Sequence, residues 1–99
     1  MKKTKLKTTP YDPVDYLKTE EDMAAYMEAA LEDGHPAVVA MAVGNIARAK
    51  GMTKVAKDAG LSRATMYKSF REGGNPEFAT VIKVINALGL KFHVEPIHA

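Results

Sequence analysis

Residues 53–68 read Thr53-Lys-Val-Ala-Lys-Asp-Ala-Gly60-Leu-Ser-Arg-Ala-Thr-Met-Tyr-Lys68 and predict two short helices joined by a tight turn. Ala56 stands four residues before Gly60, where two helices that cross at close range need a small side chain. Gly60 supplies the positive φ that such a turn requires. Apolar side chains are expected to lock the two helices together: Val55, Ala59, Leu61 and Met66. The stretch is interpreted as a helix-turn-helix that extends to residue 72.

Polar and basic residues gather at the start of the second helix, the end that a recognition helix directs at base edges in the major groove. Ser62 is the expected N-cap, and Arg63 can contact guanine through two hydrogen bonds or bind a phosphate. The preceding helix begins near Thr53, and its free N–H groups can bind a phosphate oxygen. The candidate DNA-binding residues are Thr53, Lys54, Ser62, Arg63, Thr65 and Lys68. Unspecific attraction is expected from Arg48, Lys50, Lys54 and Lys57. An ordinary helical hairpin is the alternative interpretation.

Two helices are predicted before this motif. Thr19 opens a capping-box-like Thr-Glu-Glu-Asp, and apolar residues at helical spacing continue from there to Gly34. Pro36 suits the first position of a second helix, which Gly51 ends. Residues 1–18 show no helical period and predict an extended arm.

The chain after the motif predicts a helix and a strand. The helix capped by Ser62 is expected to run to about Glu72 and to end at Gly73-Gly74. A fifth helix is expected to begin at Asn75-Pro76 and to end at Gly89. One side of it carries Phe78, Val81, Ile82, Ile85 and Leu88. Alternation of apolar and polar residues from Leu90 to Glu95, before Pro96, then predicts a β-strand.

These elements predict an all-α fold of five helices with a short C-terminal β-strand. The expected divisions are an N-terminal extended arm at 1–18, a helical domain at 19–89 and a strand with a tail at 90–99. With 99 residues, 46% of them hydrophobic, the chain has the size of one domain and enough apolar residues for one core.

Composition and spacing exclude several classes of site. The chain has no cysteine, which excludes disulfides, thiolate zinc sites, iron–sulfur clusters and a cysteine nucleophile. No Gly-rich phosphate loop or Ser nucleophile elbow occurs, so neither an enzyme nor a cofactor is expected. His93, Glu95 and His98 lie close together, but no further ligand follows at a recognisable spacing, so no metal is expected. The longest uncharged run, 35–47, is too short to span a bilayer, and no secretory signal is visible, which predicts a cytoplasmic protein.

The segment from Gly60 to Leu90 resembles the Cro/C1-type, lambda-repressor-like helix-turn-helix domain. More narrowly, Thr9 to Val94 resembles the probable addiction-module antidote proteins, HigA-like antitoxins that are encoded beside a toxin of the RelE/ParE superfamily. The more specific marks are the early Tyr11-Asp-Pro-Val-Asp-Tyr-Leu17, the acidic helix after it and the turn Glu72-Gly-Gly-Asn-Pro76. Met66 and Phe70 stand where many members carry Leu. The resemblance implies a dimeric repressor that autoregulates its operon and neutralises its toxin through protein–protein contact.

The formal net charge of +2 is an average over unlike blocks. Residues 10–35 hold eight acids and one Lys, for a net −7, whereas residues 36–74 hold seven bases and two acids, for a net +5. The acidic block suits a small basic RelE/ParE-like toxin by charge complementarity, with Tyr11, Tyr16 and Leu17 as apolar anchors. Solvated helix surfaces and tyrosines that cover the core are the alternative.

A single terminal strand leaves backbone groups without partners, so it is expected to pair with its symmetry mate, with the arm near Thr4–Thr8 or with a toxin sheet. A homodimer is preferred, because a two-fold would place two recognition helices about 34 Å apart for a palindromic operator. The sequence thus favours a repressor of double-stranded operator DNA that acts as an antitoxin. Two alternatives stay open: a solitary or phage-type Cro-like regulator, and a protein-interaction module that no longer touches DNA.

Overall fold

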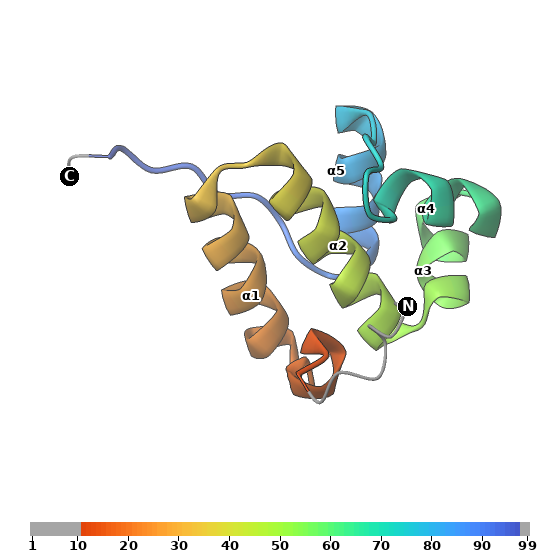
Figure 1. The fold of residues 1–99 in the computed structure, drawn as a ribbon, viewed down its shortest axis with the longest axis horizontal. Coiled ribbons are helices and arrows are strands. Elements are labelled where there is room, and N and C mark those ends of the chain that lie inside the picture. Colours follow the sequence, from red (N-terminus) through yellow and green to blue (C-terminus); the bar gives the residue numbers. More distant parts are fainter. Residues whose placement is uncertain (1–10, 98–99) are drawn as a thin grey trace, which may run out of the picture.

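The structure, a computed structural model, describes residues 11–97. Its elements are the 3-10 helix η2 (Pro13–Tyr16) and the α-helices α1 (Glu20–Asp33), α2 (Pro36–Lys50), α3 (Met52–Ala59), α4 (Arg63–Phe70) and α5 (Phe78–Ala87). Figure 1 shows α1 and α2 as a helical hairpin, with α5 behind α2 and with α3 and α4 on the side away from α1. The predicted all-helical architecture with five α-helices is confirmed for these residues.

Helix α2 is the centre of the fold, because it packs against η2, α1, α3, α4 and α5. Its buried side chains are mostly small, and short side chains allow several neighbouring helices to approach one axis. The buried residues of α2 are Ala40, Ala42, Val43, Gly44, Ile46 and Ala47. Helix α2 therefore contacts every other helical element of the described chain, including α3 and α4, which carry the site described below.

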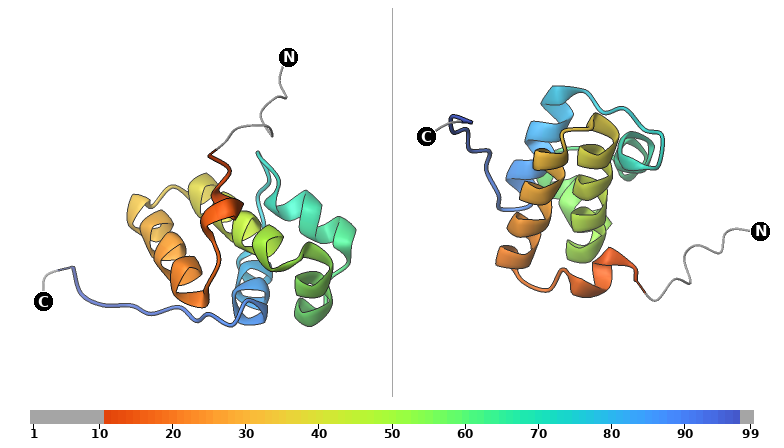
Figure 2. Two further views of the ribbon diagram at one scale, coloured as in Figure 1. Left: turned by 90° about the horizontal axis from the view of Figure 1, so that it is seen from below. Right: turned by 60° about the vertical axis from the view of Figure 1, so that its left-hand side comes forward.

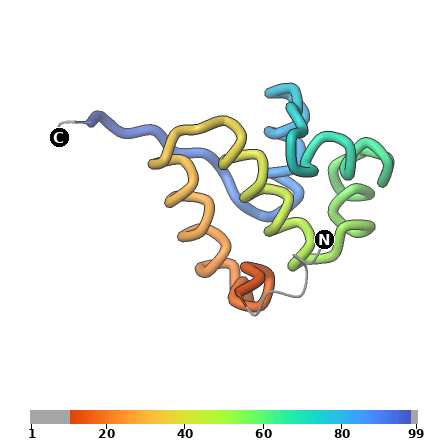
Figure 3. The backbone as a smooth tube through the Cα atoms, viewed as in Figure 1, coloured from red at the N-terminus to blue at the C-terminus, as the bar shows by residue number. Residues whose placement is uncertain are grey.

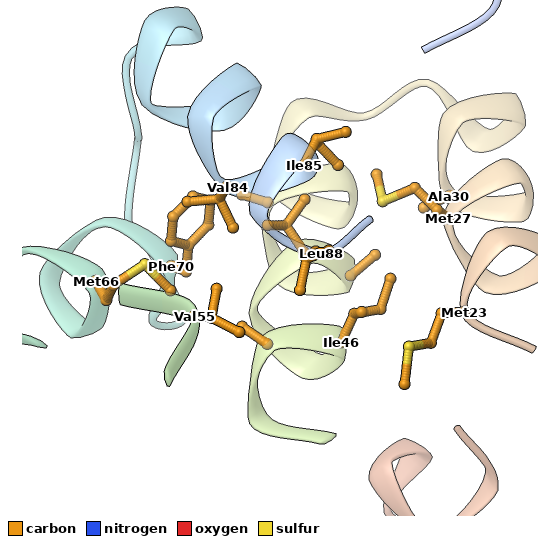
Figure 4. Packing of buried hydrophobic residues seen from close by; sticks show 14 of the residues in the cluster. Met23, Met27, Ala30, Ile46, Val55, Met66, Phe70, Val84, Ile85 and Leu88 are labelled. Atoms are coloured by element: carbon orange, nitrogen blue, oxygen red, sulfur yellow. The ribbon is translucent and has the colours of Figure 1, made fainter. Parts of the chain in front are cut away.

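Apolar side chains from all five α-helices meet in one core (Figure 4). Met66 on α4 is fully buried, and it lies beside Phe70 in the part of the core next to α3. The largest side chains with almost no exposed surface are those of Val43, Ile46, Val55, Met66, Val84, Ile85 and Leu88. Because Met66 and Phe70 both lie in this core, their departure from Leu is a change of packing within it.

The ends of α1 follow the prediction. Thr19 is the N-cap: its hydroxyl accepts a hydrogen bond from the Asp22 backbone N–H at 3.0 Å. The Asp22 carboxylate in turn accepts from the backbone N–H groups of Thr19, at 3.0 Å, and Lys18, at 3.1 Å. At the other end Gly34 adopts φ +83°, the left-handed conformation that ends a helix. The capping box and the glycine stop are both confirmed.

These contacts make α1 sensitive to acid. The backbone N–H groups of Thr19 and Lys18 lower the pKa of Asp22 below its ordinary value. A lowered folded-state pKa stabilises the protein above the unfolded-state pKa of about 3.9, and this contribution is lost as the pH falls through the folded-state value. We expect Asp22→Asn to be less stable than the parent at pH 7, and we expect this deficit to shrink as the pH is lowered to about 2. Urea unfolding followed by circular dichroism at both pH values measures this. An equal deficit at both values would contradict the assignment.

Two helix boundaries differ from the prediction. Helix α4 ends at Phe70 and not near Glu72, and α5 begins at Phe78 with Glu77 as its N-cap, not at Asn75-Pro76. The buried side of α5 also differs, since Phe78 is 73% exposed whereas Val84 is buried. Phe78 stacks instead on Phe92, with ring centroids 6.4 Å apart. The apolar residues of α5 cover more than one side, and packing against α2 and α3 selects the side that is buried.

The described part of the predicted arm is not wholly extended. Residues 13–16 form η2, and the Asp12 carboxylate caps it by accepting from the Val14 N–H at 3.1 Å. Leu17 then enters the core with 7% of its surface exposed. Packing of η2 against α2 holds this turn in place. The prediction of Leu17 as an anchor for another protein is therefore wrong, because its side chain is already buried within the chain. Residues 1–10 of the predicted arm lie outside the described residues.

The predicted C-terminal β-strand is not formed: residues 11–97 contain no strand. Residues 90–97 leave α5 and continue as an extended segment past α1, which the views of Figure 2 and the trace in Figure 3 both show. A β-ladder needs the edge of a second strand, and the described helices offer none. Residues 98–99 of the predicted tail, with His98, and the arm segment 4–8 lie outside the described residues.

Candidate nucleic-acid interface

The turn between α3 and α4 has the chemistry that the sequence predicts. Gly60 adopts φ +74°, and the Leu61 N–H donates to the Ala56 carbonyl at 2.9 Å, which closes the turn over the end of α3. Val55 and Ala56 are buried where α3 meets its neighbours, and Met66 is buried below α4. Ala59 and Leu61 are only partly buried. The two helices therefore have a fixed relation to each other and to the core.

A close approach between α2 and α4 sets the position of α4, and the sequence analysis did not identify it. Gly44 in α2 is buried against the C-terminal end of α4. A Cβ at this position would lie 2.9 Å from the carbonyl oxygen of Phe70 and 3.2 Å from its Cβ. The distance of 2.9 Å is shorter than a real Cβ atom tolerates. The Phe70 carbonyl oxygen belongs to the backbone, so it cannot rotate away from the added Cβ as a side chain could.

We therefore expect Gly44→Ala to destabilise the protein by about 1–3 kcal/mol, although alanine favours a helix interior over glycine by about 1 kcal/mol. Chemical denaturation of the variant measures the change. Gly44→Ser carries the same Cβ and serves as a second case. A gain in stability for Gly44→Ala would show that α2 and α4 are not in contact at this point.

The first turn of α4 carries the predicted polar residues on its exposed surface. Ser62 is the N-cap, as predicted: its hydroxyl oxygen accepts from the Thr65 N–H at 3.0 Å, and its hydroxyl lies 2.9 Å from that of Thr65. Arg63 lies at the first helical position, and Lys68 follows on the next turn. All six candidate residues are exposed: Thr53, Lys54, Ser62, Arg63, Thr65 and Lys68. The turn of α4 thus presents hydroxyl and guanidinium groups to solvent on a rigid support.

Tyr67 belongs to this surface and was missed by the sequence analysis. The Arg63 guanidinium donates to the Tyr67 hydroxyl at 3.1 Å, and its central carbon lies 5.3 Å from the centroid of the Tyr67 ring. Tyr67 is 46% exposed. The i,i+4 spacing of Arg63 and Tyr67 within α4 is the signal that identifies such a pair from sequence. The tyrosine limits the directions in which the guanidinium extends from the helix.

The start of α3 forms the second part of the surface, one helix length away from Ser62. Gly51 is the N-cap of α3 and carries no side chain, so no side-chain oxygen accepts from the first N–H groups of the helix. Thr53 and Lys54 lie in this first turn. The structure thus places Thr53 and Lys54 at one end of α3 and the other four candidate residues beyond its opposite end.

Several of the cations predicted to add unspecific attraction are held by carboxylates of the chain itself. Lys54 lies 2.7 Å from Asp58, and this ion pair lowers the pKa of the Asp58 carboxyl. Arg48 lies 3.1 Å from Asp12, whose pKa it lowers through a hydrogen bond. Lys50 lies 3.5 Å from Glu20 and donates to the Leu88 carbonyl at 3.2 Å. Outside these ion pairs, the exposed cations of α3 and α4 in the described chain are Lys57, Arg63 and Lys68, and Arg71 lies just beyond α4. Arg71, which directly follows α4, was not among the candidates.

The carboxylates of the acidic block, residues 10–35, are likewise of two kinds: some are paired within the chain and others are exposed. Four of its carboxylates bind groups within the described chain: Asp12, Glu20, Asp22 and Asp33. Glu28 and Glu32 instead line a groove of about 660 Å³ between α1 and residues 90–97, together with Leu31, Glu95 and Lys91. Leu31 is 42% exposed. Tyr11 and Tyr16 have exposed fractions of 76% and 61%. The described chain therefore has an acidic groove on α1 and a basic surface on α3 and α4.

Comparison with known proteins decides the family. Residues 7–96 match the family described as probable addiction module antidote proteins. The chain belongs to this family. A Haemophilus influenzae protein (strain ATCC 51907 / DSM 11121 / KW20 / Rd), described as uncharacterized, is 41% identical over 85 residues, which are 86% of this chain and 88% of that protein. No solved structure matches the chain.

Membership of the antidote family supports the role of antitoxin in a toxin–antitoxin module and implies a toxin as partner. Antidote proteins of addiction modules are in general not enzymes. Within residues 11–97, no helix is long and apolar enough to cross a membrane. His93 and Glu95 lie 3.6 Å apart, and no group of three or more potential metal ligands occurs among the described residues.

Proposed function

We propose that the chain binds operator DNA through a helix-turn-helix formed by α3 and α4, and that it represses the operon of its own toxin–antitoxin module in the cytoplasm. One observation carries the proposal. Ser62, Arg63, Thr65 and Lys68 are exposed on α4, while Met66 and Phe70 of the same helix are buried in the core. A short, rigidly seated helix with hydroxyl and basic groups on its outer side has the design of a recognition helix.

The structure supports a division of roles within this surface. Arg63 is the residue for base contact, because its guanidinium can donate two hydrogen bonds to guanine and Tyr67 restricts where it extends. The uncapped first turn of α3 offers N–H groups to a phosphate oxygen, with Lys54 beside it. Lys57, Lys68 and Arg71 add attraction to the backbone of the duplex. Phosphate contacts would fix the register of the protein, and Arg63 would carry the sequence preference.

The antitoxin part of the proposal names a small basic toxin of the RelE/ParE type as the partner. The family supplies the antitoxin role, and the groove on α1 supplies a surface of suitable charge. Glu28 and Glu32 stand one helical turn apart and repel each other at this spacing, so a basic side chain placed between them would relieve that repulsion. Leu31 adds an exposed apolar contact in the same groove.

Co-expression with the product of the neighbouring gene tests this part. The untagged toxin is expected to purify with the tagged chain, and the double variant Glu28→Lys/Glu32→Lys is expected to lose it. A matched control is Glu21→Lys/Asp15→Lys, which reverses the same number of exposed charges outside the groove. Equal losses for both variants would exclude the groove as the binding surface. If no small basic protein purifies with the parent chain, a solitary regulator replaces the antitoxin.

Autoregulation is tested with a reporter under the promoter of the chain's own operon. We expect expression of the chain to lower reporter activity, and expression of Arg63→Ala to leave it near the unrepressed level. Operator binding is expected to involve a homodimer, because two copies of α4 related by a two-fold match a palindromic site. Full repression by Arg63→Ala would remove α4 from the mechanism.

A further inference from the structure

Residues 91–97 are an extended segment with open backbone edges. The Leu90 N–H donates to the Ile85 carbonyl at 3.1 Å, and beyond Leu90 no backbone hydrogen bond joins this segment to another part of residues 11–97. The side chains of Val94 and Ile97 are 89% and 94% exposed. Figures 1 and 3 show the segment extending away from the helices, beyond α1. Exposed apolar side chains on an unpaired edge are a template for pairing with another strand.

We propose that this segment pairs in antiparallel register with the same segment of a second copy of the chain, with the two-fold axis at His93. The inference rests on the proposed function, which requires a homodimer, and it specifies where the two copies meet. It also explains why an alternating sequence typical of a strand forms none in the isolated chain.

Charge complementarity selects the register. With the two-fold at His93, Lys91 lies directly opposite Glu95 of the second copy, and symmetry repeats this pair on the other side of the axis. A two-fold at residue 92 would place Lys91 opposite His93, and one at residue 94 would place it opposite Ile97. A shift by one residue would place charged side chains opposite apolar ones. Opposite charges that face each other across strands stabilise a pair, so the register at His93 is favoured.

The position of Pro96 agrees with this register. Opposed residues in an antiparallel pair alternate between those that exchange two backbone hydrogen bonds and those that exchange none. If His93 and its copy exchange hydrogen bonds, then Lys91 and Glu95 of the second copy also do. Pro96 then lies opposite Leu90 at a position that exchanges none, so its missing N–H costs nothing. The ladder is thus complete up to the proline.

The same register also gathers the apolar side chains. Phe92 lies opposite Val94 of the second copy, an aromatic residue against a β-branched one. Phe92 is half-buried and stacks on Phe78, which is 73% exposed. Pairing would therefore cover Val94 with the stacked rings of Phe92 and Phe78 of the other copy, and Phe92 packs against the core of that copy. The two paired segments would form a two-stranded ribbon. Its two faces would differ, with the charged residues Lys91 and Glu95 on one and the apolar residues Phe92 and Val94 on the other.

Single cysteines test the register, because the chain has none of its own. We expect His93→Cys to form an intermolecular disulfide readily under mild oxidation, since its Cα atoms would be about 5.5 Å apart across the axis. Lys91→Cys and Glu95→Cys are the controls. In the two-stranded ribbon each would stand about 14 Å from its own copy, at about 3.4 Å per residue, which is too far for a disulfide. Similar cross-linking at all three positions, or none at His93→Cys, would overturn the proposal.

Charge reversal provides an independent test without cysteine. Sedimentation of the full chain is expected to show a dimer. Lys91→Glu or Glu95→Lys should raise its dissociation constant about tenfold, because each places like charges opposite each other twice. The double variant Lys91→Glu/Glu95→Lys restores both pairs and should return the constant to within about threefold of the parent. Equal dissociation constants for the single and double variants would overturn the proposal, and so would a parent protein that stays monomeric.

A third measurement separates this inference from the proposed function. Binding of each variant to the operator is measured beside its self-association. If the ribbon is absent while operator binding still depends on Arg63, the interface at residues 91–95 is wrong and the proposed function stands. If the ribbon forms but no duplex is bound in a sequence-dependent manner, the proposed function fails by itself.

Discussion

Arg63→Ala is expected to lower the affinity of the chain for its operator by about tenfold to a hundredfold per half-site. Arg63 carries the only guanidinium on the outer side of α4 in the described structure, and this planar fork can donate two parallel hydrogen bonds to one base. Its loss should also reduce the preference for the operator over a scrambled duplex. Fluorescence anisotropy with both duplexes, at one fixed salt concentration, measures the two effects together.

The controls separate base contact from charge. Lys68→Ala removes a charge from the same helix and should weaken binding to the operator and to the scrambled duplex alike. Lys18→Ala removes the same charge from an exposed position between η2 and α1 and should change neither. If Arg63→Ala weakened both duplexes equally, Arg63 would be a phosphate contact. If it had no effect, α4 would not be the recognition helix.

Met66→Ala is expected to destabilise the protein by about 2–5 kcal/mol, the largest effect on stability that we predict. Met66 is fully buried where α4 meets the core, and alanine would leave a cavity beneath the helix. The cost includes both the lost burial and the cavity. For a domain of this size such a change is a large part of the total stability. Chemical denaturation followed by circular dichroism measures it.

Met41→Ala is a matched control for this variant. Met41 lies on α2 and is 45% exposed, so the same substitution should change the stability by about 0.5 kcal/mol or less. Operator binding by Met66→Ala, measured at a temperature where the variant is still folded, should be weakened because α4 loses its support. Equal stability losses for the two methionines would contradict the packing of α4 described here.

Local signals made much of the fold predictable. Helix caps and helix stops depend only on residues within one turn of their own position. The hydroxyls of Thr19 and Ser62 accept as N-caps, and Gly34 and Gly60 end helices with a positive φ. Four of the five α-helices begin within one residue of their predicted start, and two of these, α1 and α4, begin at a predicted side-chain cap. The exposure of Arg63 likewise follows from its place after a cap, with Met66 as the buried residue of the same turn.

Features that depend on distant residues were not predictable from the sequence. The buried side of α5 is selected by α2 and α3, so Phe78 was assigned to the wrong side. The close approach at Gly44 involves Phe70, and the ion pair that holds Arg48 involves Asp12, 36 residues away. The strand at 90–95 was predicted from alternation alone, which gives no information about whether a partner edge exists within the chain. These are properties of packing, not of local sequence.

The central claim is that α3 and α4 bind DNA with sequence preference, and a salt titration of operator binding tests it most directly. The duplex upstream of the chain's own gene and a scrambled duplex of equal composition are titrated with the parent protein between 50 and 200 mM salt. With about six phosphate contacts, the affinity should fall on the order of 10³-fold across this range, and the operator should be preferred throughout. Binding that is indifferent to salt, or equal for the two duplexes, would contradict the account.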